Sequence, residues 1–318
     1  MDNNDILKKV ISHSKANGFI YQSSEIYDGL SAVYDYGPYG SELKNNLKEF
    51  WWKSMTQMND NIVGIDSSVF MDPMTWKASG HIDAFNDPLI DNKDSKKRYR
   101  ADVLIEEYIA KVKTKIDKEI AKAKKRFGEK FDEKVYRDTN ERVKKYISQV
   151  NEISSKMNGF LKDNDLKGLR GLIGDLNIND PVSGTSNWTD VKQFNLMFST
   201  EIGSTSESSK KIFLRPETAQ GIFLNFLNVV NSTRVKIPFG IAQIGKAFRN
   251  EIIARQFIFR MREFEQMEMQ FFVEPGSEMK WYEEWKNKRM KWHNALGLGE
   301  NLYKFHDHEN LAHYANAA

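Results

Sequence analysis

Residues 248–272 read FRNEIIARQFIFRMREFEQMEMQFF, and this stretch decides the fold that we expect. It holds four arginines and four glutamates among aromatic and aliphatic side chains. Over 259–272, successive side chains fall on opposite faces, as in a β-strand, so that Arg260, Phe264 and Glu268 share one face. We therefore predict a strand over 259–272.

A second strand is predicted over 239–251. A connection of at most eight residues, 252–259, then allows the two strands to pair antiparallel. One face of the second strand is formed by Gln243, Gly245, Ala247, Arg249 and Glu251. Because the side chains of this face are small until Arg249 is reached, the face leaves room for a ligand.

The paired strands bring guanidinium groups beside one aromatic ring and two carboxylates. Arginine matches phosphate oxygens through its planar fork, an exposed phenylalanine can stack on a purine, and carboxylates accept hydrogen bonds from amino groups. These residue types indicate an ATP site with room for an amino compound. The alternative is a sheet with cross-strand Arg–Glu pairs, the usual role of a single pair. The regular spacing of Arg260, Phe264 and Glu268 favours the ligand site.

The composition limits the class of protein. The chain has 318 residues, 40% hydrophobic and 29% charged, as in a soluble globular protein large enough for two domains. It contains no apolar run near the ~20 residues of a membrane-spanning helix and no apolar signal segment at its beginning. The absence of cysteine excludes disulfides, thiolate zinc sites and a cysteine nucleophile. We expect a cytoplasmic protein without a membrane partner.

Residues 93–170 differ in charge from the rest of the chain. They hold 23 Lys/Arg against 14 Asp/Glu, a balance of +9, within a net charge of +3 for the whole sequence. From 101 to 157 the pattern is helical, with heptad-like apolar positions and no proline. We predict a helical insertion at 93–170 between two parts of a catalytic domain, 1–92 and 171–318. Its charge indicates either a polyanion partner or a solvated helical face, and the pattern leaves both open.

The second half of the chain contains one misleading pattern. Residues 240–247, GIAQIGKA, approach the phosphate-binding loop pattern, but Ala247 stands where a magnesium-binding hydroxyl is needed. We expect a strand there instead. Strands are expected to dominate from 212 onward, with a helix over 278–296.

Three histidines, His306, His308 and His313, lie near the end of the chain. They show no ligand spacing of known geometry, so we expect surface histidines and predict no metal site.

Several motifs resemble one known family. FRNE, a connection and FRMREFEQME resemble the second signature motif of the class II aminoacyl-tRNA synthetases. LRPETAQGIF, PFGIAQIGKAFRNEI, ASGHIDAFNDPLIDNK and KKRYRAD are similar to motifs of the homodimeric type of glycyl-tRNA synthetase. The resemblance runs through 1–100 and 185–318 and is weaker across the helical segment.

The resemblance implies an α+β fold, with an antiparallel sheet flanked by helices, and a homodimer. It also implies a ligase that forms glycyl-adenylate from glycine and ATP with Mg²⁺ and then transfers glycine to tRNA(Gly). Arg249 would hold the α-phosphate and Arg260 the outer phosphates, so these two are the expected catalytic residues. Glu251 would bind the adenine, and Phe264 would stack under it.

The matched positions give two expected residue sets. The ATP-binding set is Arg249, Asn250, Glu251, Phe259, Arg260, Met261, Arg262, Glu263 and Phe264. The glycine-binding set is Arg100, Glu217, Phe264, Glu265, Gln266, Met267 and Glu268. Within it, Glu217 and Glu268 would bind the glycine ammonium. Without the motif, Arg100 would be interpreted as a surface charge in a basic run.

Two departures from the family pattern matter. Many bacterial relatives carry a cysteine pair before KKRYRAD, whereas this chain has DNKDSKKRYR, so no structural zinc is expected. The chain also ends at Ala318, before the third class II motif and an anticodon-binding domain, so we expect an incomplete fragment with poor activity of its own. The alternative function is a non-catalytic, synthetase-like protein that binds RNA or mediates dimerisation.

Overall fold

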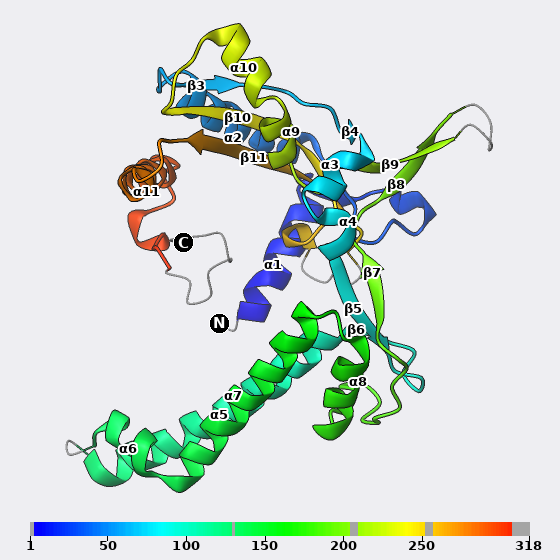
Figure 1. Ribbon diagram of the computed structural model, residues 1–318, viewed down its shortest axis with the longest axis vertical. Helices are drawn as coiled ribbons and strands as arrows, with labels where there is room; N and C mark the ends of the chain where they lie inside the picture. Colours follow the sequence, from blue (N-terminus) through cyan, green and yellow to red (C-terminus); the bar gives the residue numbers. More distant parts are fainter. Residues whose placement is uncertain (1–2, 129–130, 204–208, 252–256, 307–318) are drawn as a thin grey trace. The chain divides into compact units, whose positions relative to one another are not determined.

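The computed structural model describes residues 3–128, 131–203, 209–251 and 257–306 (Figure 1). The chain divides into two compact units, one formed by 1–81 and 197–318 and the other by 82–196. Both mix helices with mainly antiparallel strands, so the fold class is α+β, as expected. No helix in the described ranges is long and apolar enough to cross a membrane.

The first unit contains most of the strands. Its helices are α1 (Asn3–Ala16), α2 (Pro38–Thr56), α3 (Pro73–Ala78), α9 (Ala219–Leu224), α10 (Phe226–Thr233) and α11 (Glu278–Ala295). Short 3₁₀ helices are η1 (Glu25–Tyr27), η3 (Phe257–Phe259) and η4 (Glu300–Leu302). Its strands are β1 (Ile20–Gln22), β2 (Tyr34–Tyr36), β3 (Ile62–Gly64), β4 (Phe70–Met71), β8 (Ser199–Ile202), β9 (Lys210–Leu214), β10 (Phe239–Phe248) and β11 (Glu263–Phe272). The short helix α4 (His81–Ala84) begins at His81, which is the last residue of the first segment of this unit.

The predicted antiparallel pair is confirmed. β10 and β11 pair over ten positions, from Phe239 opposite Phe272 to Phe248 opposite Glu263, and β3 adds to β10 in parallel. GIAQIGKA is part of β10, as expected, and not a phosphate-binding loop.

Both predicted strands were too long. After Phe248 and Glu263, one hydrogen bond follows, from Arg249 N to Arg262 O at 2.9 Å. Phe257 then has φ 52°, which an extended strand does not allow, and η3 occupies 257–259. The rest of the predicted connection, 252–256, lies outside the described residues.

The two faces of the β10–β11 pair differ in what covers them. On one face, Ala242 and Ile244 pack with α2 and α11 through Trp51, Met55 and Trp285. On the other, α9 and α10 cover the apolar end of the strands, where a core cluster contains Ile222, Val229, Phe239 and Ile241. The polar end of this second face, from Gln243 onward, carries the candidate site.

The expectation that strands dominate from 212 onward was wrong for 219–233. This segment forms α9 and α10, because its apolar residues Ile222, Phe226, Val229 and Val230 recur at helical spacing and face one core cluster. The predicted helix over 278–296 is confirmed as α11.

The second unit is built on long helices. Its helices are α5 (Ala101–Phe127), α6 (Glu133–Thr139), α7 (Glu141–Lys162) and α8 (Leu166–Asp175), and its strands are β5 (Asn86–Asp91), β6 (Arg98–Arg100) and β7 (Lys192–Asn195). Apolar residues at helical spacing on α5, among them Leu104, Ile105, Ile109 and Val112, are buried against α7 and α8. The basic side chains of α5 lie on its exposed surface.

This unit extends beyond the basic segment 93–170 named from the sequence. The difference arises because β5 precedes the segment and β7 follows it, yet the two strands pair antiparallel from Asn86 opposite Asn195 to Leu89 opposite Lys192. The pairing holds both flanks in one body with the helices. The positive charge of the sequence identified the helical part of this unit, whereas the pairing of β5 with β7 determines where the compact unit begins and ends.

A closed polar network lies beside β6. The carboxylate of Asp180, 2% exposed, accepts hydrogen bonds from Tyr99 Oη at 2.5 Å, Ser183 Oγ at 2.7 Å and the backbone N–H of Val182 at 3.1 Å. Burial alone would raise the pKa of Asp180, but these hydrogen bonds, with another from Ser95, outweigh it and hold the pKa far below its usual range.

This network predicts acid sensitivity. A carboxylate whose pKa is lowered by folding stabilises the native state above its unfolded pKa of about 4 and loses this contribution as the pH falls below that value. We expect Asp180→Asn to be less stable than the wild type at neutral pH and to lose less stability between about pH 5 and pH 3. Urea unfolding across this range is the measurement. Asp163→Asn, at an exposed position, is the matched control, and equal slopes in all three proteins would contradict the prediction.

Candidate active site

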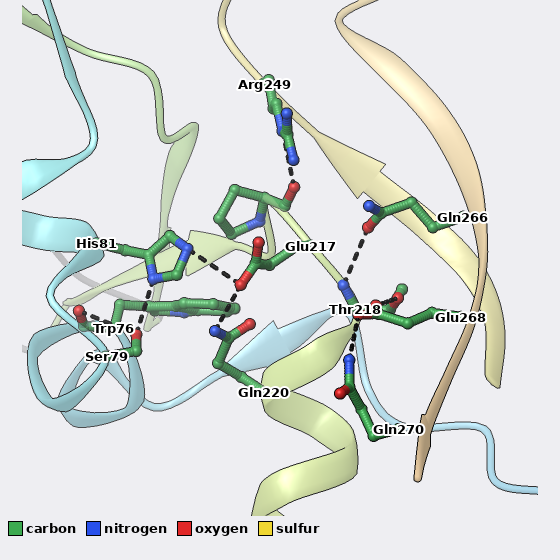
Figure 2. A network of polar contacts seen from close by, with 11 residues as sticks. Trp76, Ser79, His81, Glu217, Thr218, Gln220, Arg249, Gln266, Glu268 and Gln270 are labelled. Carbon is green, nitrogen blue, oxygen red and sulfur yellow. Dashed lines mark hydrogen bonds and ion pairs between the residues drawn. The ribbon is translucent and has the colours of Figure 1, made fainter. Parts of the chain in front are cut away.

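The turn between β9 and α9, residues 215–218, crosses the polar end of the β10–β11 face (Figure 2). Thr218 fixes it there with two hydrogen bonds: its N–H donates to Gln266 Oε1 at 3.1 Å and its hydroxyl to Glu268 Oε2 at 2.5 Å. Gln266 and Glu268 reach the same turn because alternate residues of a strand share one face. We call residues 215–218 the strap.

The carboxylate of Glu268 is oriented from both sides. Oε2 accepts from Thr218, and Oε1 accepts from Gln270 Nε2 at 2.7 Å. Each carboxylate oxygen has two acceptor positions, so both retain capacity for a further donor. An ammonium group could therefore bind without breaking either contact.

A second carboxylate, Glu217, lies on the strap itself (Figure 2). Its Oε1 accepts from Gln220 Nε2 at 2.6 Å and lies 3.3 Å from His81 Nε2. The hydrogen bond from His81 is the largest influence on the pKa of Glu217. With the bond from Gln220 and the charges of protonated His81 and of Arg249, it outweighs burial and lowers that pKa. Glu217 is therefore held as an anion.

Arg249 leaves the end of β10 toward the strap. Its Nε donates to the carbonyl of Pro216 at 3.1 Å, and its guanidinium carbon lies 5.3 Å from the ring centroid of Phe264. This places a cation, an aromatic face and the carboxylate of Glu217 near one another, a combination that can bind an anionic group, a flat ring and an amino group.

Arg215, the first residue of the strap, anchors it to the neighbouring backbone. This guanidinium is 2% exposed and donates to three backbone carbonyls, Lys246 O at 2.7 Å, Ser67 O at 2.8 Å and Ser68 O at 3.4 Å. Burial lowers the pKa of Arg215, and the charge of Asp66 opposes this effect. A Cβ atom on Gly245 would come within 2.2 Å of Arg215 Nη2, so only glycine leaves space for this guanidinium.

A cavity of about 530 Å³ lies at the end of the β10–β11 pair. The predicted ATP-binding residues that line it are Arg249, Glu251, Phe259, Arg260, Met261 and Phe264. The volume is within the range of small-molecule sites. The structure thus brings six of the nine predicted ATP-binding residues to one cavity.

The other three predicted ATP-binding residues have different surroundings. Arg262 donates to Glu251 O at 3.0 Å and to Ser31 O at 3.1 Å, so its guanidinium supports the backbone. Glu263 forms an ion pair with Lys246. Asn250 lies two residues after the end of β10 and is half-buried.

Strand alternation separates the predicted glycine-binding residues. Gln266 and Glu268 contact the strap, and Phe264 shares their face. Glu265 and Met267 lie on the opposite face and line the cavity together with Phe264. There Glu265 forms ion pairs with Lys44 at 2.9 Å and Lys48 at 2.8 Å. A contact of Glu265 or Met267 with glycine stays a prediction.

Arg100 lies in the second unit at the end of β6. It pairs there with Asp87 at 3.0 Å and with Asp102 at 2.6 Å. A contact with substrate stays a prediction for this residue.

Five polar residues that build the site were not predicted from the sequence: His81, Arg215, Thr218, Gln220 and Gln270. Three of them lie within LRPETAQGIF, so the motif that supplied Glu217 carried the signal. His81 lies in ASGHIDAFNDPLIDNK and comes from a distant part of the chain, which no local pattern reveals.

The described residues contain no group of three or more His, Asp or Glu side chains that could hold a metal ion. His306 is exposed, while His308 and His313 lie outside the described residues. Mg²⁺ enters the chemistry below as part of the ATP substrate.

Two family models match consecutive parts of the chain. The glycyl-tRNA synthetase insertion domain 1 matches residues 87–196, and the tRNA synthetase class II core domain (G, H, P, S and T) matches residues 198–316. The first match coincides with most of the second compact unit, 82–196.

Curated relatives match almost the whole chain. A glycine–tRNA ligase of Chlorobaculum tepidum is 46% identical over 313 residues, which are 98% of this chain and 61% of the relative. Those of Macrococcus caseolyticus and Staphylococcus haemolyticus are 46% and 47% identical over 98% of this chain and 59% of each relative. The chain therefore spans about 60% of the length of these relatives. With these two family models and relatives matched over 98% of its length, the chain belongs to the glycyl-tRNA synthetase family of class II.

Proposed function

We propose that the protein carrying this chain is a glycine–tRNA ligase, which activates glycine with ATP and transfers it to tRNA(Gly). The observation that supports this most directly is the pair of oriented carboxylates, Glu217 and Glu268, beside the Arg249–Phe264 contact. The two carboxylates suit an ammonium group, and the Arg249–Phe264 contact suits a purine nucleotide.

In the proposed reaction, a carboxylate oxygen of glycine attacks the α-phosphorus of ATP, and the bond to pyrophosphate breaks. The attacking group is already ionised, so the site needs positioning and charge neutralisation more than acid–base catalysis. Arg249 would neutralise the α-phosphate, and Arg260, in the same cavity, the outer phosphates. Glu251 and Phe264 would bind the adenine, while Mg²⁺ would arrive with the ATP phosphates.

Two features would select glycine: carboxylates that bind its ammonium group, and a lack of space for a side chain on its Cα atom. Glu217 and Glu268 attract the ammonium, while the strap, fixed by Thr218 against the sheet, limits the space for a side chain.

ATP–pyrophosphate exchange with each proteinogenic amino acid tests the proposal. We expect strong glycine-dependent exchange in the complete enzyme and weak exchange from residues 1–318 alone. Activation of another amino acid without glycine would reject the glycine assignment. No exchange with any amino acid, together with tRNA binding, would favour the non-catalytic RNA-binding alternative.

We also propose that α5 contributes to tRNA binding. Its last turns carry Lys122, Lys124, Lys125 and Arg126, all exposed, in the segment with a charge balance of +9. Changing the four to glutamine should weaken tRNA binding and reduce the slope of log K against log[salt], because each phosphate contact releases counterions. Filter binding between about 50 and 200 mM salt measures both.

The matched control replaces four exposed lysines of the first unit, Lys8, Lys15, Lys280 and Lys304. It should leave the salt slope close to that of the wild type. If the α5 variant also keeps the wild-type slope, these side chains form only a solvated helical face.

We propose further that the enzyme is a cytoplasmic homodimer. Tyr39, Leu43 and Phe50 of α2 are 66%, 52% and 40% exposed, and apolar exposure on one helix supports a subunit contact. Sedimentation of the wild type against a Leu43→Glu variant would test this surface.

A further inference from the structure

The imidazole of His81 is fixed at both nitrogens (Figure 2). Nε2 lies 3.3 Å from Glu217 Oε1, and Nδ1 lies 2.8 Å from Ser79 Oγ. Trp76, fully buried, packs edge-on to the ring, with ring centroids 5.5 Å apart and an interplanar angle of 76°. The His81 side chain is only 13% exposed, so its surroundings hold the ring in one orientation against the carboxylate.

The surroundings of the ring suit two protonation states. Ser79 Oγ lies within hydrogen-bond reach of His81 Nδ1 and also 3.4 Å from Trp76 O. With a neutral ring, the Ser79 hydroxyl donates to Nδ1, and Nε2–H donates to Glu217. With a protonated ring, Nδ1–H donates to Ser79 Oγ, and the hydroxyl turns to the Trp76 carbonyl. Each state keeps its partners, so protonation changes the charge beside Glu217 without displacing the ring.

Glu217 is sensitive to that charge. Its Oε1 is occupied by Gln220 and His81, and among the described residues no hydrogen bond reaches its Oε2. Arg249, from the end of β10, already acts on the carboxylate as a cation. From α3, the uncharged side chains of Trp76 and Ser79 face the ring, and the carboxylate of Glu217 faces it from the strap.

We infer that His81 positions Glu217 for the substrate ammonium when its ring is neutral and weakens this site when its ring is protonated. The inference rests on the proposed function, because it takes glycine as the ligand of Glu217. A carboxylate flanked by Arg249 and an imidazolium attracts a further cation less strongly than one flanked by Arg249 alone. His81 is therefore a positioning residue that makes glycine binding depend on pH.

The variant His81→Gln tests this, because glutamine keeps an N–H donor but does not take up a proton at Nε2. The KM values for glycine and ATP are measured by exchange between about pH 6 and pH 8. For the wild type we expect the glycine KM to rise about fivefold toward the acidic end, the effect of a partly exposed charge pair, with a much smaller change for ATP. For His81→Gln we expect a nearly constant glycine KM.

His13→Gln, the same change at an exposed histidine of α1, is the control and should keep the wild-type profile. Ser79→Ala leaves His81 in place but removes the hydroxyl, so the pH at which the glycine KM rises should shift. A wild-type profile in both His81→Gln and Ser79→Ala would overturn the inference, as would an equal rise in KM at every pH. Exchange without any dependence on glycine in the wild type would instead reject the proposed function.

Discussion

Replacing Glu217 or Glu268 by glutamine is expected to raise the KM for glycine about ten- to a hundredfold. Each change keeps the shape of the side chain but removes the negative charge that binds the ammonium, and a charge-assisted hydrogen bond contributes about 1.5–3 kcal/mol. The KM for ATP should change far less, because the nucleotide contacts are assigned to Arg249, Glu251, Arg260 and Phe264. Steady-state exchange with glycine and ATP varied separately is the measurement.

Glu265→Gln is the matched control for this prediction. It makes the same chemical change on the same strand, but on the opposite face, where Glu265 pairs with Lys44 and Lys48. We expect a lower melting temperature for this variant and an unchanged glycine KM. If Glu268→Gln behaves in the same way, Glu268 only braces the strap through Thr218 and does not bind glycine.

The second large effect is expected for Arg215→Met. Methionine fills much of the space of the arginine but leaves the carbonyls of Lys246, Ser67 and Ser68 without their donor. Hydrogen bonds that involve a charged group contribute about 1.5–3 kcal/mol each, so the loss of stability should reach about 3 kcal/mol or more. Because the strap carries Glu217, exchange activity should also fall, even at temperatures where the variant is folded.

Urea unfolding measures the change in stability. Arg234→Met, at an exposed position after α10, should stay within about 0.5 kcal/mol of the wild type. Arg215→Lys, which keeps a charge but loses the planar fork, should fall between the two. Equal stability of Arg215→Met and Arg234→Met would mean that other contacts hold the strap.

The β10–β11 pair was predictable because the patterns that specify it lie within one short stretch of the sequence. Alternation of side chains assigned Gln243, Gly245, Phe264 and Glu268 to one face, and a short connection required antiparallel pairing. The strand ends were not predictable in this way. Arg249 and Arg262 continue the alternating pattern, but the chain leaves the ladder there, and Phe257 adopts a left-handed conformation.

Local sequence patterns could not predict which residues surround the site. Alternation already separates Glu265 from Glu268, but the family motif groups them by sequence, and only the contact with α2 shows where Glu265 is used. His81, the first residue of α4, contacts Glu217 across a large separation in sequence, which is a tertiary contact between distant segments. Hydrogen-bond partners such as Thr218 and Gln270 likewise depend on how the strap crosses the sheet.

The pairing of β5 with β7 has an evolutionary consequence. Asn86 and Asn195 are neighbours across two antiparallel strands, and Leu196 N donates to Phe85 O at 3.1 Å, so the second unit begins and ends at almost one point. A segment with adjacent ends can be gained, lengthened or exchanged by recombination while the chain on either side keeps its path. The helices α5 and α7 can therefore change in length and charge while both flanks of the unit keep their positions, whereas an insertion in the strap or in the β10–β11 pair would disrupt the contacts of Thr218 and Arg215.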